Sequence, residues 1–267
     1  MRKACLAAAC LFLSLPALAQ AGGSQTPTSG QDRLFLTFAE EAAVVPHQWW
    51  EGQLEFRDGD PIDATILRGI VALKPWQNLE VGGRVGFGNT DSSDLPDGSG
   101  ATDLDVWGKY HFAAGGAQTE FAAGALVTVP TGDDSVGLGD DSFDLEGFGS
   151  VRFRTDQLIL SGVAGVRFNG DGQLFGGEEL PDGFETSGKT SVLLSGGALY
   201  PVSDVFSLTG EAYFESERVE GADSDFRLGA GVNWRPWNRG MLRGAVIVGL
   251  SDGAPDAQIL AGYAYTF

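Results

Sequence analysis

The stretch that decides the fold is Ala257–Phe267, AQILAGYAYTF. Every second residue from Ile259 to Phe267 lies on one face if the stretch is a β-strand, because side chains alternate across a strand. That face is apolar and ends in three aromatic rings. The end of a soluble domain is usually frayed and polar. The stretch therefore favours a strand that faces lipid, with an edge strand of a soluble β-sandwich as the alternative.

Twelve strand candidates, each longer than ten residues, follow one another from His47 to Phe267. Strands in soluble proteins average about 5–6 residues, whereas tilted membrane strands need about 9–11. Short turns such as Thr155–Asp156 alternate with longer polar loops such as Asn169–Ser187. This alternation is typical of a bacterial barrel with both termini in the periplasm. The expected strands are 47–57, 63–74, 78–88, 102–113, 117–129, 142–154, 157–168, 188–200, 204–218, 223–235, 240–251 and 256–267.

The order of residues within the strand candidates distinguishes a lipid-facing barrel from a soluble β-sandwich. In the first one, Trp50, Leu54 and Phe56 share one face, and Glu51 and Glu55 lie on the other. Large rings recur at both ends of the candidates with small aliphatic residues between them, as in the two aromatic girdles of a lipid-facing surface. The sequence predicts an all-β fold, a transmembrane antiparallel up-and-down β-barrel of about twelve strands at residues 47–267. The last strand resembles the assembly signal of bacterial outer-membrane barrels.

Residues 1–21 have the pattern of a secretory signal peptide, in which a basic start precedes an apolar run and a small-residue cleavage site. The apolar run is too short for a membrane-spanning helix. Both cysteines, Cys5 and Cys10, fall inside this peptide, so the mature chain is expected to lack thiol chemistry. Residues 22–46 predict a flexible lead-in, of which 32–45 form either a short helix or an extended segment. The expected location is the bacterial outer membrane.

The charge balance limits the kinds of partner. Removal of the signal peptide would take the formal net charge from −19 to about −21. Such acidity disfavours nucleic acid, which binds to basic surfaces. The expected partners are outer-membrane lipid and lipopolysaccharide, the barrel-assembly machinery through the last strand, and a small-molecule solute. The barrel itself is expected to be a monomer.

Residues 103–153 carry the most specific local pattern, the strand DLDVWGKYHF followed by ALVTVPTGDDSVGLGDDSFDLEGFGSVRF. The W-G-K-Y strand, the V-P-T-G-D loop entry and the G-L-G-D element are similar to those of the MetA-pathway-of-phenol-degradation family of outer-membrane transporters. The resemblance implies a porin-like outer-membrane barrel and the passage of small hydrophobic or aromatic molecules. It brings no catalytic residue and no cofactor.

Inward-facing charged side chains are the candidate functional site. They form either a polar scaffold whose charges and hydrogen-bonding groups pair with one another or a constriction that selects solutes by charge. The inward Trp107 either fills the lumen or stacks on an aromatic solute. The candidates are Arg68, Arg84, Trp107, Lys109, Glu120, Asp144, Arg152, Arg167, Glu215 and Arg227. The expected neighbours are Glu120 with Lys109 and Arg152, Asp144 with Arg167, Glu215 with Arg227, and Arg68 with Arg84.

Metal and catalytic chemistry have weaker signals. The stretch Pro130–Asp133 predicts a turn, with a gating loop as the alternative. An outer-membrane phospholipase needs a His–Ser pair at its outward end, whereas His111 is expected to point inward beside a short turn. Two histidines and a mature chain without cysteine disfavour a zinc site. An acidic cluster without EF-hand spacing fits a solvated loop better than a Ca²⁺ site, although divalent bridges to lipopolysaccharide remain an alternative; it comprises Asp133, Asp134, Asp140, Asp141 and Asp144.

The sequence thus leads to a non-enzymatic outer-membrane channel for passive uptake of small molecules. The alternative is a structural or surface barrel whose lumen is closed by salt bridges. Ion conductance discriminates between these two hypotheses, because only an open lumen carries current.

We expect the refolded mature chain to give a β-rich circular dichroism spectrum in detergent. Its migration on an electrophoresis gel should change on heating, because a closed barrel resists unfolding by detergent alone. A helical spectrum would contradict the whole prediction.

Overall fold

The computed structural model describes residues 32–45, 48–59, 62–92, 95–113, 118–174 and 184–267. The expected signal peptide and residues 22–31 and 46 of the expected lead-in lie outside this part of the chain. No helix in the described ranges is long and apolar enough to cross a membrane.

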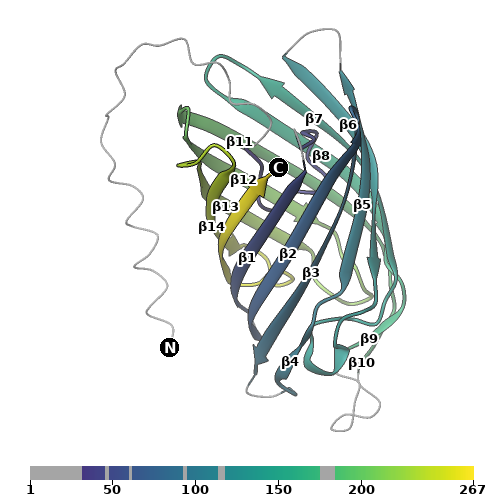
Figure 1. The fold of residues 1–267 in the computed structure, drawn as a ribbon. Helices are drawn as coiled ribbons and strands as arrows, with labels where there is room; N and C mark the ends of the chain where they lie inside the picture. The colour runs from purple at the N-terminus through teal and green to yellow at the C-terminus, as the bar shows by residue number, and fades with distance from the viewer. Residues whose placement is uncertain (1–31, 46–47, 60–61, 93–94, 114–117, 175–183) are drawn as a thin grey trace.

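Twelve long strands close into one antiparallel barrel (Figure 1). Strands that follow one another along the chain are neighbours, and the first also pairs with the last. The predicted twelve-stranded barrel is confirmed, and the predicted bounds agree to within about three residues. The strands are β1 (Trp49–Asp58), β2 (Asp63–Trp76), β3 (Leu79–Asp91), β5 (Leu104–Ala113), β6 (Thr119–Val129), β7 (Asp144–Arg154), β8 (Ile159–Phe168), β11 (Thr190–Ser203), β12 (Phe206–Glu215), β13 (Asp225–Trp234), β14 (Gly240–Gly249) and β15 (Ala257–Thr266).

The pairing of β1 with β15 closes the barrel. It is antiparallel and runs without interruption from the pair Trp49 and Thr266 to the pair Asp58 and Ala257. Closure gives every strand a partner on both sides, which the hydrocarbon core of a membrane requires because it offers no water to unpaired backbone groups.

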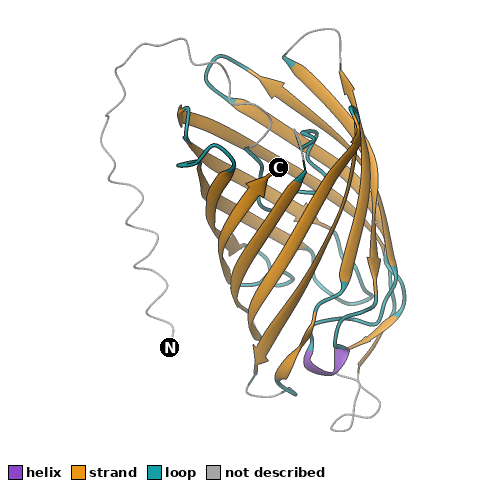
Figure 2. Cartoon of the chain, in the orientation of Figure 1, coloured by secondary structure: helices purple, strands orange, loops and turns teal. Residues whose placement is uncertain are grey.

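The long connections contain short elements that the sequence analysis missed. β4 (Gly98–Ala101) pairs with the end of β3, and β9 (Gly172–Leu174) pairs with β10 (Phe184–Thr186). A 3₁₀ turn, Asp134–Val136, is the helix drawn in purple in Figure 2. All of these elements lie at the long-loop end of the barrel (Figure 1). They are too short for hydrophobic periodicity to reveal them.

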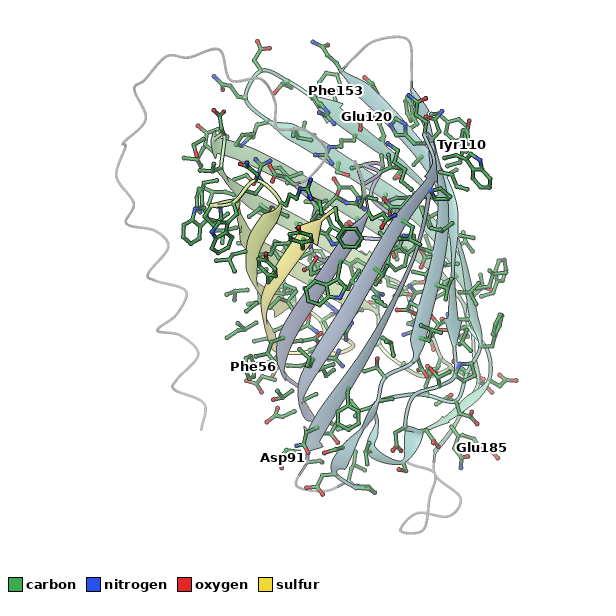
Figure 3. The ribbon with its side chains drawn as sticks, viewed as in Figure 1. Phe56, Asp91, Tyr110, Glu120, Phe153 and Glu185 are labelled. Atoms are coloured by element: carbon green, nitrogen blue, oxygen red, sulfur yellow. The ribbon has the colours of Figure 1, made fainter. Side chains whose placement is uncertain are left out.

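The outer surface is the lipid-facing band that parity predicted. Phe56 and Phe87 are 46% and 62% exposed near the long loops, and Tyr110 and Phe153 are 47% and 41% exposed near the short turns. Figure 3 shows Phe56 near one end of the barrel and Tyr110 and Phe153 near the other. Between the girdles the exposed side chains are mostly aliphatic or glycine. Exposed aromatic and aliphatic side chains of this extent fit contact with lipid.

The described residues that precede β1 are folded inside the barrel. Residues 32–45 are buried except for partial exposure of Leu36 and Val44, and their backbone forms turns without a helix. This outcome differs from the flexible lead-in expected at 22–46, as far as the described part reaches. The physical reason is that this stretch carries apolar and charged side chains that find partners on the lumen wall, as the following contacts show.

A charge in the middle of the lipid-facing band should destabilise the barrel. Val85, midway along β3, and Val205, in the short turn between β11 and β12, are both 45% exposed. We expect Val85→Arg to lower the free energy of unfolding by about 2–4 kcal/mol and Val205→Arg by at most about 1 kcal/mol. Denaturant unfolding in lipid vesicles measures both. Equal losses would contradict the assignment of Val85 to the membrane interior.

Candidate functional site

Residues 32–45, which we call the lumen segment, enter and leave the barrel at the short-turn end. The Asp32 carboxylate lies 3.5 Å from Arg235, just after β13. The Val45 amide donates to Glu80, at the start of β3, at 2.7 Å. Between these two ends the backbone turns back on itself. The lumen segment therefore reaches into the barrel and returns to the same side.

Two inward-facing glycines let the lumen segment lie close to the wall. A Cβ atom on Gly197 in β11 would lie 2.7 Å from Leu34 Cδ1, and one on Gly231 in β13 would lie 2.6 Å from Phe35 Cε2. Contacts this short between carbon atoms are repulsive, so a larger residue would push the Leu34 or Phe35 side chain aside. Glycine at both positions therefore leaves room for the side chains of the segment.

Buried charges hold the lumen segment to the wall, and none of their side chains is exposed to solvent. Arg152 Nη1 lies 2.8 Å from Glu41 Oε1. Arg33 Nη1 lies 3.3 Å from Glu80 Oε2, and Lys109 Nζ lies 3.2 Å from Glu80 Oε1. Lys109 also donates to the carbonyl oxygen of Glu41 at 2.8 Å. Each buried charge has an opposite charge beside it, without which its burial would be strongly unfavourable.

Wall side chains also satisfy the backbone of the lumen segment. Arg243 in β14 forms an ion pair with Glu51 at 2.7 Å. It also donates to the carbonyl oxygens of Arg33 and Leu34 at 2.9 and 2.8 Å. Glu211 in β12 accepts hydrogen bonds from the next two amides at 2.7 and 2.8 Å. The segment thus replaces helix or sheet hydrogen bonds with bonds to side chains.

Aromatic rings pack around the lumen segment. Phe38 lies 5.6 Å from Trp49 and 6.1 Å, edge to face, from Trp107, measured between ring centroids. The Trp107 indole N–H donates to Glu80 Oε1 at 3.1 Å. A Cβ atom on Gly82 would lie 2.2 Å from Trp107 Cζ2. Trp107 therefore lies flat against β3 and fills the lumen.

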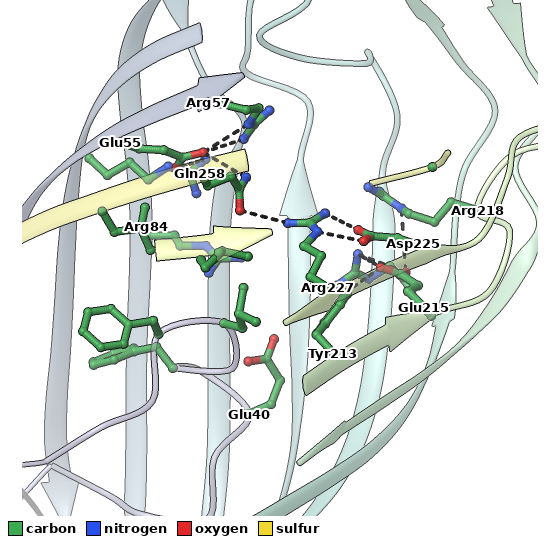
Figure 4. Close-up of a pocket in the computed structure, with 18 of the residues that line it drawn as sticks. Glu40, Glu55, Arg57, Arg84, Tyr213, Glu215, Arg218, Asp225, Arg227 and Gln258 are labelled. Carbon is green, nitrogen blue, oxygen red and sulfur yellow. Dashed lines mark hydrogen bonds and ion pairs between the residues drawn. The ribbon is translucent and has the colours of Figure 1, made fainter. Parts of the chain in front are cut away.

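A cavity of about 520 Å³ lies between the lumen segment and the long loops (Figure 4). A second cavity of about 250 Å³ adjoins it, and we call the two together the vestibule. The lumen segment forms the floor of the vestibule with Phe35, Leu36, Phe38 and Glu40. Besides Arg243, the arginines that line it are Arg57, Arg68, Arg84, Arg167, Arg218 and Arg227.

The arginines of the vestibule are paired with carboxylates. Such charge-assisted pairs neutralise one another and fix the orientation of the guanidinium groups. The pairs are Arg84 with Asp105 at 2.6 Å, Arg167 with Glu146 at 2.6 Å and with Glu215 at 3.3 Å, Arg218 with Asp144 at 2.6 Å, Arg68 with Glu55 at 3.0 Å, Arg57 with Glu55 at 2.9 Å, and Arg227 with Asp225.

The ten predicted lumen residues fall into two groups and one outlier. Trp107, Lys109 and Arg152 contact the lumen segment or its anchors. Glu120 lies nearer the short turns, where it pairs with Arg154 at 2.7 Å. The remaining residues line the vestibule or pair with its lining, and they are Arg68, Arg84, Asp144, Arg167, Glu215 and Arg227.

Several expected neighbours differ from the observed ones. Arg68 and Arg84 do lie close enough to interact, and Glu120 lies opposite Arg152. Lys109, however, pairs with Glu80 and not with Glu120. The two other expected pairs are not directly opposite each other but are offset by two residues, which is one step along the same face, so residue parity cannot detect the offset. The residue opposite Arg167 is Glu146 and not Asp144, and the residue opposite Arg227 is Tyr213 and not Glu215.

The sequence analysis missed the residues that anchor the lumen segment. Glu51, Glu80 and Arg243 alternate with the outward-facing apolar residues of their strands, so the inward direction of their side chains could be predicted. Arg33 and Glu41 lie in a stretch without periodicity, and their partners are distant in sequence. The one available signal was the mixture of apolar and charged residues at 32–45, which is unlike the Gly/Ser/Thr-rich stretch before it.

The loop at Pro130–Asp133 forms a turn, as its composition predicts. Asp103 accepts hydrogen bonds from the amides of Thr131 and Gly132 at 3.1 and 2.8 Å. Burial raises the pKa of the Asp103 carboxyl, and nearby Asp140 raises it further, while the two amides oppose the rise. Within the described ranges, no group of three or more acidic, histidine or cysteine side chains is placed to hold a metal ion.

His111 has an acidic neighbour at the short-turn end. Its Nε2 lies 3.7 Å from the Glu120 carboxylate. Ser195, in the middle of β11, donates to the carbonyl oxygen of Ala212 at 3.0 Å. No contact among the described residues therefore joins His111 to Ser195. A hydrolase of the phospholipase type would require such a His–Ser pair.

In sequence comparisons, no family model and no curated protein matches the chain. Solved structures are similar in fold. An outer membrane channel from Pseudomonas putida F1 has a TM-score of 0.69 at 15% identity, over 88% of this chain and 100% of that one. The KdgM porin in complex with disordered oligogalacturonate has a TM-score of 0.56 at 11% identity, over 82% of this chain and 99% of that one.

The NanC porin also has a TM-score of 0.56 at 11% identity, over 82% of this chain and 100% of that one. The fold is therefore the β-barrel of bacterial outer-membrane proteins. The resemblance to the MetA-pathway-of-phenol-degradation family finds no matching family model and stays a prediction.

Removal of Glu41 should loosen the lumen segment. Glu41→Ala removes the ion-pair partner of the buried Arg152 and leaves Arg33 to share Glu80 with Lys109. We expect a loss of about 3–5 kcal/mol in the free energy of unfolding, together with faster hydrogen exchange of the segment amides.

The matched control is Glu217→Ala, which removes an exposed partner of Lys189. It should leave both the unfolding midpoint and the exchange rates unchanged. Unchanged exchange in Glu41→Ala would contradict an anchoring role for the buried pairs.

Proposed function

We propose that the protein is a non-enzymatic outer-membrane channel for passive uptake of small molecules, with its lumen closed in this conformation by the lumen segment. The observation that carries the proposal is the vestibule, a cavity inside the barrel that extends from the segment to residues at the long-loop end such as Thr186 and Gly253. A volume of about 520 Å³ is in the range of small-molecule sites. A solute that fills it would need the segment to move before it could pass.

The composition of the vestibule supports a small solute with an apolar part. Phe35, Leu36 and Phe38 of the lumen segment lie on one side, with Ile70 and Leu260 of the wall. The hydrophobic or aromatic character of the solute rests on the family resemblance and on these apolar residues. The barrel fold shared with known channels supports the general class.

The alternative function is a structural or surface barrel whose lumen stays closed. The observation that favours it is the complete burial of the ion pairs between the lumen segment and the wall. A charged pair without solvent contact resists separation, because each partner would be left uncompensated. The two functions differ in whether the lumen segment moves.

The location and partners belong to the same proposal. An outer-membrane position follows from the barrel fold and the lipid-facing band, and the signal peptide at residues 1–21 would direct the chain there. Recognition of β15 by the barrel-assembly machinery, contact of the acidic loops with lipopolysaccharide, and a monomeric state are further parts of the proposal.

A reversible crosslink tests whether the lumen segment is the gate. In the double variant Leu34→Cys, Gly197→Cys the first substitution removes the Cδ atoms that a Cβ on residue 197 would meet at 2.7 and 3.0 Å, so the two new side chains lie next to each other and a disulfide can form. We expect single-channel currents in planar bilayers to fall to background on oxidation and to return on reduction. Solute flux into proteoliposomes should follow the same pattern.

The two single cysteine variants are the controls, and oxidant should leave their currents unchanged. Currents that persist in the crosslinked barrel would show that solutes pass without movement of this segment. Silence in every variant, with the barrel shown to be folded, would favour the closed structural alternative.

A further inference from the structure

Glu40 is the one acidic residue of the lumen segment that faces the vestibule. Glu40 is only 4% exposed, yet it forms no ion pair or hydrogen bond with the described residues, and its Oε2 atom is buried without a partner among them. Figure 4 shows Glu40 below the charged groups of the cavity, pointing toward them. A buried carboxylate without a partner is costly unless something compensates its charge.

The surroundings of Glu40 increase the negative potential. Glu146 in β7 lies close enough to repel it, has no solvent exposure, and has one carboxylate oxygen without a partner among the described residues. Arg84 lies close enough to attract Glu40, but its Nε already donates to Asp105 at 2.6 Å. The Arg84 guanidinium is thus engaged with another carboxylate.

The charged side chains that line the vestibule also favour a cation over an anion. Seven arginines line the vestibule, against eight carboxylates, which are Glu40, Glu55, Asp103, Asp105, Asp140, Glu215, Asp223 and Asp225. Asp144, which pairs with Arg218, lies just outside this lining and adds a further carboxylate. Despite its many arginines, the vestibule therefore has a small excess of carboxylates, which favours a cation over an anion.

The kind of cation follows from the floor of the cavity. No group of three acidic side chains in the described part is placed around a common metal position. Glu40 instead offers one carboxylate beside Phe35, Leu36 and Phe38, so a charged group and an apolar group can be bound together. A primary ammonium group has three donors and forms charge-assisted hydrogen bonds with a carboxylate.

We propose that the vestibule binds small organic amines, with the ammonium group on the Glu40 carboxylate and the apolar body along the lumen segment. Glu146 does not line the vestibule and is not part of the amine site. The inference deepens the proposed channel function by naming a solute class, and it rests on that function only for the role of the bound amine in transport.

Three probes with one phenylethyl body test the charge preference, and these are 2-phenylethylamine, 2-phenylethanol and phenylacetate. Binding to the refolded full-length mature chain in detergent is measured by calorimetry. We expect the amine to bind at least about tenfold more tightly than the alcohol and the acid. Equal binding of amine and alcohol, or tighter binding of phenylacetate, would overturn the proposal.

The variant Glu40→Gln keeps the shape of the side chain and removes its charge. We expect it to weaken amine binding at least about tenfold and to leave binding of the alcohol unchanged. Glu220→Gln, on an exposed loop residue, is the matched control and should bind the amine like the unaltered chain. Amine affinity that survives Glu40→Gln, in protein with a β-rich spectrum, would also overturn the proposal.

The calorimetric experiment needs no transport, so it separates the two proposals. Amine binding that depends on Glu40 in a barrel that conducts nothing would uphold the binding site and reject the channel. A conducting barrel that binds no amine would uphold the channel and reject the amine site. Block of the current by the amine, absent in Glu40→Gln, would support both.

Discussion

The closure of β1 on β15 is the constraint on which the rest of the structure depends. In hydrocarbon an unpaired backbone group has no partner, so the sheet must have no edge. Closure in turn gives the barrel a fixed circumference and directs every second side chain into one enclosed space. The lumen is therefore crowded with residues such as Glu51, Lys109 and Arg152, which have to be compensated without bulk water. The lumen segment supplies part of that compensation, because Glu41 is the ion-pair partner of Arg152 and Arg33 places a second cation beside Glu80.

The barrel could be predicted from the sequence because lipid imposes a regular pattern on the outer face. Strand length, alternation and the rings of Phe56 and Tyr110 are local features, and each can be read without knowledge of the pairing. The lumen follows no such pattern. Arg243 contacts the backbone of residues 33 and 34, more than two hundred positions earlier in the chain. The partners of Asp144 and Glu215 could not be assigned, because a shift of two residues keeps every side chain on its face. The fold was therefore predictable, while the arrangement of the candidate site was not.

The lumen segment and the vestibule form one arrangement of charge. On the short-turn side of the segment, acidic and basic groups alternate at close range, as in the row of Glu41, Arg33, Glu80 and Lys109. On the long-loop side, carboxylates outnumber guanidinium groups, and Glu40 belongs to that excess. The same fourteen residues thus present compensated charges toward the wall and an uncompensated one toward the cavity. A single segment can in this way both close the lumen and define what the cavity above it attracts.

The pairing of the first strand with the last has a consequence for the order of assembly. The lumen segment is joined directly to β1, and β1 cannot complete its pairing until β15 exists, at the opposite end of the chain. The contacts of the segment with the complete ring of strands can therefore form only once this seam has formed. Contacts such as that of Arg243 with Leu34 belong to the latest stage of folding, because they join residues of very high sequence separation. Until that stage the inward charges of the unfinished sheet remain open to water, which spares them the cost of burial before their partners arrive.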